Sequence, residues 1–104
     1  MIENITFLNR QGTQLSGILR YPETKQKMPA LIVLHGFHQN KNHDLIAQLA
    51  NELGYYLLTL RFDFHGHGES FGERYVMSEQ VHDTIAAIAY VHNRPQVSKV
   101  FLFG

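Results

Sequence analysis

The sequence predicts an α/β protein, a three-layer α/β/α sandwich in which an N-terminal β-hairpin leads into a mainly parallel sheet. Two observations support this prediction. Apolar and polar residues alternate through residues 2–8, as in a half-buried strand, whereas later apolar runs are continuous, as in strands buried on both faces. Two stretches with the apolar spacing of amphipathic helices separate those runs. The alternation of strands and helices implies right-handed crossovers within one sheet.

The hairpin is predicted from residues 2–8 and 13–21, which carry the strand patterns. Gly12 lies in the turn between them and is able to adopt a positive φ. Residues 22–29 are polar and contain Lys25 and Lys27, so we expect a connecting loop.

The parallel strands are predicted at residues 30–34, 55–60 and 99–103, the last running into Gly104. Helices are expected over about 43–53, with Asn42 as N-cap and Gly54 as stop, and over about 79–92, with Ser78 as N-cap. The residues expected to face the core are Leu45, Ile46, Leu49, Ala50 and Leu53 on the first helix, and Val81, Ile85, Ile88 and Ala89 on the second.

The composition is that of one folded domain, residues 1–104, without an internal boundary. Hydrophobic residues make up 44% of the 104 residues, and the nine basic residues balance the nine acidic ones. Without a basic excess, a nucleic-acid or anionic-membrane partner is not expected. There is no cysteine, which excludes disulfides and thiolate metal sites. No signal peptide or membrane-length apolar run is visible, so we expect a soluble, cytoplasmic protein.

Two loop motifs follow the first two parallel strands. Residues 34–37 read Leu-His-Gly-Phe, and residues 63–70 read Asp-Phe-His-Gly-His-Gly-Glu-Ser. With the order of elements, these motifs resemble the N-terminal half of α/β-hydrolase-fold serine hydrolases over essentially all 104 residues. Small esterases and acylglycerol lipases of the cinnamoyl- or feruloyl-esterase type are the most similar subgroup. The resemblance implies a parent protein that hydrolyses a small-molecule carboxylic ester.

The resemblance also implies half of an oxyanion hole at Phe37. In that family the residue after the His-Gly pair donates its backbone N–H to the developing oxyanion, a contact that is typically worth roughly 3–4 kcal/mol. Gly36 allows close approach of the backbone, and Asp63 is expected to anchor its loop by accepting backbone hydrogen bonds. The supporting loop residues are expected to be His35, Gly36, Asp63, Gly66 and Gly68. The alternative is that His35 and Gly36 only turn the chain out of the strand.

Residues 68–72 match the nucleophile pattern G-x-S-x-G, but Ser70 is interpreted as structural. A nucleophile elbow requires a serine on a sharp turn between a strand and a helix, and neither flank of Ser70 provides this. Gly104 matches the first glycine of the family's elbow motif instead. The resemblance therefore places the nucleophile, the acid and the histidine after Gly104. No catalytic residue is expected in this chain, which alone should be inactive.

His65 and His67 form an H-x-H pair, which by itself is a weak metal signal, and neither a metal nor another cofactor is expected. The aromatic pairs Tyr55–Tyr56 and Phe62–Phe64 are expected to line the core or a pocket.

The apolar strand at 99–103 suggests a second class of function. The resemblance implies that one edge of this strand pairs with residues 30–34 and that the partner of its other edge is missing from this chain, which favours self-association or pairing with a second polypeptide. A non-catalytic hydrolase-like module that binds a partner through this edge is therefore an alternative to the enzyme. A third is an incomplete gene product without its own function.

Overall fold

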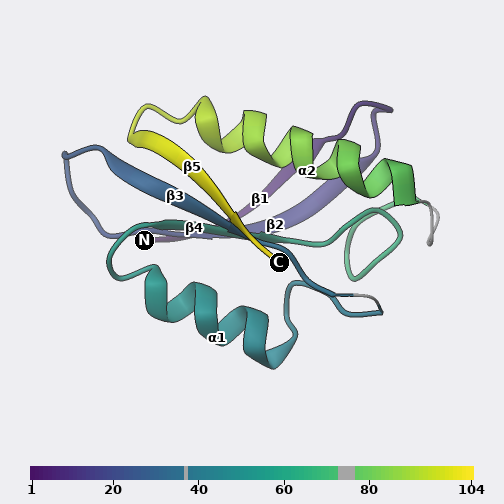
Figure 1. The fold of residues 1–104 in the computed structure, drawn as a ribbon, viewed down its shortest axis with the longest axis horizontal. Coiled ribbons are helices and arrows are strands. Elements are labelled where there is room, and N and C mark those ends of the chain that lie inside the picture. The colour runs from purple at the N-terminus through teal and green to yellow at the C-terminus, as the bar shows by residue number, and fades with distance from the viewer. Residues whose placement is uncertain (37, 73–76) are drawn as a thin grey trace.

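The structure is a computed structural model that describes residues 1–36, 38–72 and 77–104. Its elements follow the predicted order, from hairpin to alternating strands and helices (Figure 1). They are β1 (Ile2–Leu8), β2 (Gln14–Arg20), β3 (Met28–Val33), α1 (Asp44–Leu53), β4 (Leu58–Phe62), α2 (Met77–His92) and β5 (Val97–Phe103).

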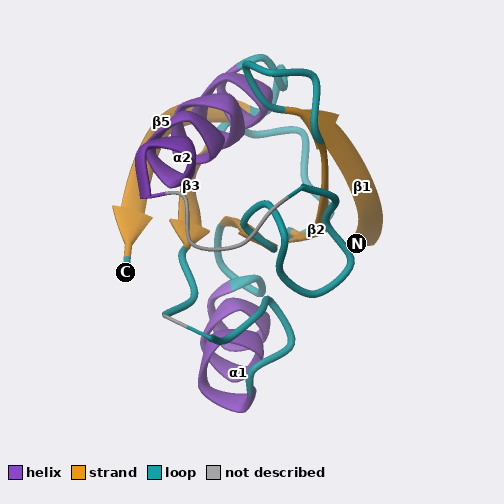
Figure 2. Cartoon of the chain, turned by 90° about the vertical axis from the view of Figure 1, so that its right-hand side faces the viewer, coloured by secondary structure: helices purple, strands orange, loops and turns teal. Residues whose placement is uncertain are grey.

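The strands form one sheet in the order β1-β2-β4-β3-β5. β1 pairs antiparallel with β2 from Ile2↔Arg20 to Leu8↔Gln14, and β2 pairs antiparallel with β4. β4, β3 and β5 are parallel. Helices α1 and α2 lie on opposite faces of the sheet (Figures 1 and 2). This arrangement confirms the predicted three-layer α/β/α architecture.

Alternate residues of the central strands supply two cores. On β3, Ala30 and Ile32 face the larger core, which includes Ala87 of α2, while Val33 faces the smaller one with Ile46 of α1. Because both faces of β3 are covered, its sequence is an unbroken apolar run, as expected for a central parallel strand.

The predicted strand at 55–60 begins too early, because β4 starts only at Leu58. The chain first continues α1 by a further turn, in which the Leu57 N–H donates to the Leu53 carbonyl. Tyr55 and Tyr56 are therefore 66% and 79% exposed, and the prediction that they line a core or pocket is wrong. The Arg20 guanidinium covers one face of the Tyr55 ring at 4.6 Å. Phe62 and Phe64, in contrast, are buried as predicted.

The starts of both helices also differ from those predicted. His43, not Asn42, is the N-cap of α1, and its side chain makes no capping hydrogen bond. Asn42 instead belongs to the preceding turn, where its N–H donates to the Asn40 side chain. Ser78 lies inside α2, which already begins at Met77.

The predicted core stripe of α2 is wrong at three of its four positions. Val81 and Ile85 are 59% and 56% exposed, and Ala89 is exposed as well. The buried stripe consists of Asp83, Ala87 and Val91. The helix is rotated so that this face is buried, because the Asp83 carboxylate has buried partners, which are described below. Ile88 is half-buried against the core, as predicted.

On α1, Leu45 is exposed rather than packed on the sheet, which corrects that position of the predicted stripe. Ile46 and Ala50 are buried in the smaller core, and Leu49 is partly buried against it.

β5 is an edge strand that pairs with β3. Within the described residues no strand pairs with its outer edge. Phe101, Leu102 and Phe103 are each about half exposed, at 53%, 48% and 54%.

Candidate functional site

The carboxyl ends of β3, β4 and β5 lie side by side at one end of the sheet. The Leu34 N–H, just after β3, donates to the Phe103 carbonyl at 2.7 Å, so the ends of β3 and β5 are joined. The loops at residues 34–41 and 63–72 leave β3 and β4 at this same end. Open α/β sheets place their ligands here, beyond the carboxyl ends of parallel strands.

His35 links the two loops through both of its ring nitrogens. Its Nε2 accepts the Phe64 N–H at 3.1 Å, and its Nδ1 lies 2.9 Å from the Gly36 carbonyl oxygen. A carbonyl can only accept, so Nδ1 carries the proton and the ring is neutral. Burial of the side chain lowers the pKa of His35, which favours the same neutral form.

Gly36 is exposed, and its peptide groups are held by Gln39. The Gly36 N–H donates to Gln39 Oε1 at 2.9 Å, and the Gln39 N–H donates to the Gly36 carbonyl at 3.1 Å. A Cβ at position 36 would lie 3.1 Å from Gln39 Oε1, so a glycine suits this close approach. Phe37 lies outside the described residues, and its assignment to the oxyanion hole stays a prediction.

Asp63 and Lys41 form a buried ion pair that ties the loops together. Asp63 Oδ2 lies 2.7 Å from Lys41 Nζ, while Oδ1 accepts the Lys41 backbone N–H at 2.7 Å. Asp63 Oδ2 also accepts the Glu69 N–H of its own loop at 2.9 Å. The carboxylate thus accepts backbone hydrogen bonds from both loops.

The loop after β4 passes so close to this carboxylate that it needs glycine. Gly66 and Gly68 have φ values of 69° and 51°, in the left-handed region that favours glycine. A Cβ at Gly68 would lie 2.4 Å from Asp63 Cγ, inside van der Waals contact.

The Ser70 hydroxyl is used in two hydrogen bonds to backbone. It donates to the Asp63 carbonyl at 2.6 Å and accepts the Ser16 N–H of β2 at 2.9 Å. Among the described residues, no histidine nitrogen is paired with this hydroxyl. These contacts attach the loop to the sheet, the role expected of a structural serine.

A second polar cluster joins the loop to α2. The Asp83 carboxylate is buried and accepts from the Asn9 side-chain amide at 2.8 Å and the His65 N–H at 2.9 Å. His65 Nδ1 lies 2.7 Å from the same carboxylate, and His65 Nε2 lies 3.3 Å from Glu79 Oε2. This network fixes the first half of α2 over the loop.

The H-x-H pair does not converge on a common point. His65 faces the carboxylates of α2, whereas His67 Nδ1 lies 2.9 Å from the His65 carbonyl. Over residues 1–36, 38–72 and 77–104, no group of three histidine, aspartate or glutamate side chains is arranged to hold a metal ion.

Sequence reasoning missed Lys41 and Asp83. Lys41 is a loop lysine with no local pattern, yet it is only 2% exposed. Asp83 lies in an amphipathic helix, where a carboxylate normally marks the solvent face. Asp83, Ala87 and Val91 are spaced so that they lie on one face of a helix. A more apolar stripe of the same helix has equal spacing, and it was therefore predicted to be the buried face.

Neither a family model nor any curated protein matches this chain. Solved structures do. The chain is similar to the α/β hydrolase GrgF from Penicillium sp. sh18, with 24% identity and a TM-score of 0.87, over 98% of this chain and 36% of that one. Est1E from Butyrivibrio proteoclasticus, solved with ferulic acid bound, gives 24% identity and a TM-score of 0.86, over 96% and 41%. An α-β serine hydrolase homologue from Coxiella burnetii gives 25% and 0.81, over 98% and 51%.

These likenesses show that the chain has the fold of the N-terminal part of an α/β hydrolase, as the loop motifs indicated. The chain spans between 36% and 51% of the length of these three structures. Among the described residues there is no helix of sufficient length and hydrophobicity to cross a bilayer.

Proposed function

We propose that the protein containing this chain is a serine hydrolase of carboxylic esters, in which residues 1–104 supply the scaffold and one half of the oxyanion hole. The observation that carries the proposal is the junction of the two loops at the carboxyl ends of the parallel strands, fixed by His35 and the Asp63–Lys41 pair. The similarity in fold to esterases adds support.

In this proposal the nucleophilic serine follows Gly104. The end of β5 reaches the loop after β3, because a Cβ at Gly104 would lie 3.1 Å from the Leu34 Cβ. A serine just beyond would attack the ester carbonyl carbon while a histidine takes its proton. The histidine gives this proton to the leaving alcohol, and water then hydrolyses the acyl-enzyme.

The proposal makes Phe37 the oxyanion donor and His35 a positioning residue. The carbonyl and the following N–H of one trans peptide are rigidly linked. The His35 Nδ1–H and the Gln39 N–H both hold the Gly36 carbonyl, so they would set the direction of the donor. The N–H after the serine would supply the second hydrogen bond.

Labelling with a fluorophosphonate probe tests the proposal. We expect the full polypeptide to be labelled, its Ser70→Ala variant to be labelled equally, and residues 1–104 alone to remain unlabelled. An unlabelled full polypeptide would refute the serine-hydrolase proposal. Labelling of residues 1–104 that disappears in Ser70→Ala would show instead that Ser70 is the nucleophile.

The outer edge of β5 pairs with no strand among the described residues, which favours a second candidate, a non-catalytic module that binds a polypeptide by strand addition. A stable complex with a second polypeptide, purified without ester hydrolysis or probe labelling, would favour this function over the enzyme.

A further inference from the structure

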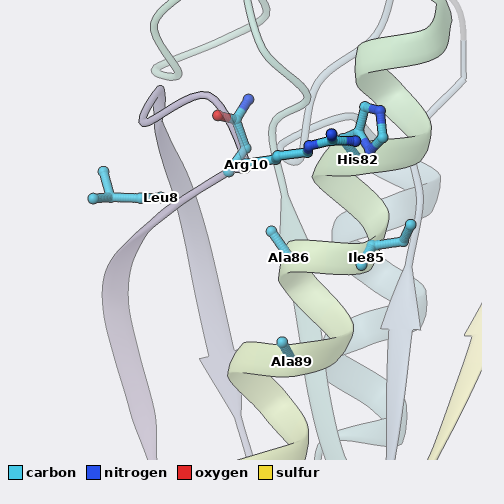
Figure 3. Close-up of a pocket in the computed structure, with 7 residues that line it drawn as sticks. Leu8, Arg10, His82, Ile85, Ala86 and Ala89 are labelled. Carbon is cyan, nitrogen blue, oxygen red and sulfur yellow. The ribbon is translucent and has the colours of Figure 1, made fainter.

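A groove runs along the outer flank of α2, apart from the loops at residues 34–41 and 63–72. Its two walls are the end of β1 with the following turn, and one side of the helix (Figure 3). Its volume is about 330 Å³, enough for a small organic molecule. The lining residues are Leu8, Asn9, Arg10, His82, Ile85, Ala86 and Ala89.

The floor of the groove is apolar and depends on two alanines. Ala86 and Ala89 leave space along the helix, and Leu8 and Ile85 are apolar residues of the same lining. Larger side chains at the alanine positions would fill the hollow.

The turn that forms one wall is held firmly in place. Asn9 Oδ1 accepts the N–H groups of Gln11 and Thr13, both at 2.9 Å, and the Asn9 amide donates to the buried Asp83 at 2.8 Å. The groove is therefore anchored on both walls by one buried residue pair, which favours a preformed site.

One end of the groove carries two basic groups. The Arg10 side chain extends from the turn toward His82 on the helix (Figure 3). Among the described residues, neither side chain has a hydrogen-bond or ion-pair partner. Asp83 does not neutralise them, because its carboxylate is buried and bound to Asn9 and His65.

We propose that this groove binds a small amphipathic carboxylate, with its carboxylate on Arg10 and His82 and its apolar body along Ala86 and Ala89. A guanidinium offers a planar pair of donors that matches a carboxylate, and the adjacent imidazole adds a further donor. The volume fits a body of about one aromatic ring or a short acyl chain. The inference is independent of the ester-hydrolase proposal.

The test is an NMR titration of the full polypeptide with 3-phenylpropionate, followed by amide shifts. We expect saturable shifts confined to residues 8–10 and 82–89. The uncharged 3-phenylpropanol should bind at least about tenfold more weakly, because it has no negative charge to pair with the Arg10 guanidinium. Acetate, which lacks the apolar body, should also bind more weakly.

Two variants and a control sharpen the test. Arg10→Gln should weaken binding by about tenfold or more, and Ala89→Leu should abolish it by filling the groove. Both side chains are exposed, so the melting temperature should be unchanged. Lys25→Gln, which removes an exposed cation outside the groove, should leave binding unchanged.

Equal binding of acid and alcohol, insensitivity to Arg10→Gln, absence of saturable shifts, or shifts centred on β5 would each overturn the proposal.

Discussion

The Lys41 ammonium is the most deeply buried cation at the junction of the two loops. Burial by itself lowers the pKa of Lys41, but its hydrogen bonds to Asp63 and Glu69 outweigh burial and raise the pKa above its usual value. Lys41 therefore stays charged, and its charge depends on the buried Asp63 carboxylate. Glu69, whose side chain is 72% exposed, shares the same ammonium from the solvent side.

Replacing Asp63 should be far more costly than replacing Glu69. Asp63→Asn removes the buried counter-charge of Lys41 and leaves only the exposed Glu69 carboxylate, and losing the buried partner of an ion pair costs about 3–5 kcal/mol of unfolding free energy. The matched variant Glu69→Gln removes an exposed charge and should cost under about 1 kcal/mol. Urea unfolding of the full polypeptide measures both. Equal losses would mean that Lys41 is solvated rather than buried.

His35 should make stability depend on pH in one direction. Because burial lowers its pKa in the folded state, the unfolded chain binds the proton first as pH falls below about 6.5. The stabilisation from neutral His35 is thus complete above that pH and is lost on acidification toward its lower folded-state pKa.

The measurement compares urea unfolding of the wild type and His35→Ala between pH 7.5 and 5.5. The advantage of the wild type should shrink as pH falls, by at most about 1.4 kcal/mol per pH unit. An advantage that grows on acidification would require a protonated His35 and would contradict the Phe64 N–H to Nε2 hydrogen bond.

At the scale of elements, the rotation of α2 about its axis is set by a carboxylate. The helix has two candidate faces at the same spacing, one with Val81 and Ile85 and one with Asp83, Ala87 and Val91. The second face is buried because Asn9 and His65 satisfy Asp83, while small Ala87 allows close packing on the sheet.

This rotation predicts unequal effects of truncation along α2. Val91→Ala removes fully buried methyl groups and should cost about 2 kcal/mol of unfolding free energy. Ile85→Ala trims an exposed side chain and should change stability by less than about 0.5 kcal/mol. Chemical denaturation of both variants decides between the two faces: a larger loss at Ile85 would reverse the assignment.

The sequence was informative where a pattern is local. The alternation in β1, the apolar run of β3 and the glycine loops all follow from short-range rules. The partners of Lys41 and Asp83 are not local, since Asp63 and Asn9 lie 22 and 74 residues away. The strand order brings the loops that follow β1, β3 and β4 to one end of the sheet. Only there do these charged side chains meet the partners that offset the free-energy cost of burying them. The start of β4 was missed because the end of α1 overrode the strand propensity of Tyr55 and Tyr56.

At the scale of the molecule, the two edges of the sheet differ in character. β1 is an edge protected by polar side chains, including Glu3, which pairs with Arg94 of the α2–β5 connection at 2.8 Å. β5 carries one charge, Lys99, and then Val100-Phe101-Leu102-Phe103. Apolar residues beside unpaired backbone N–H and C=O groups form a template for a further strand. In the part of the chain that the structure describes, no strand pairs with the outer side of β5.

Residues 1–104 expressed alone should therefore self-associate through β5. Sedimentation should show oligomers that grow with concentration. Phe101→Lys should shift the distribution toward monomer, because a charge at an edge opposes strand pairing. The matched variant Leu45→Lys places the same charge on an exposed apolar site of α1 and should have no such effect. A monodisperse wild-type monomer with a cooperative melt would contradict the prediction. Equal rescue by both variants would assign the association to general hydrophobicity rather than to the edge of β5.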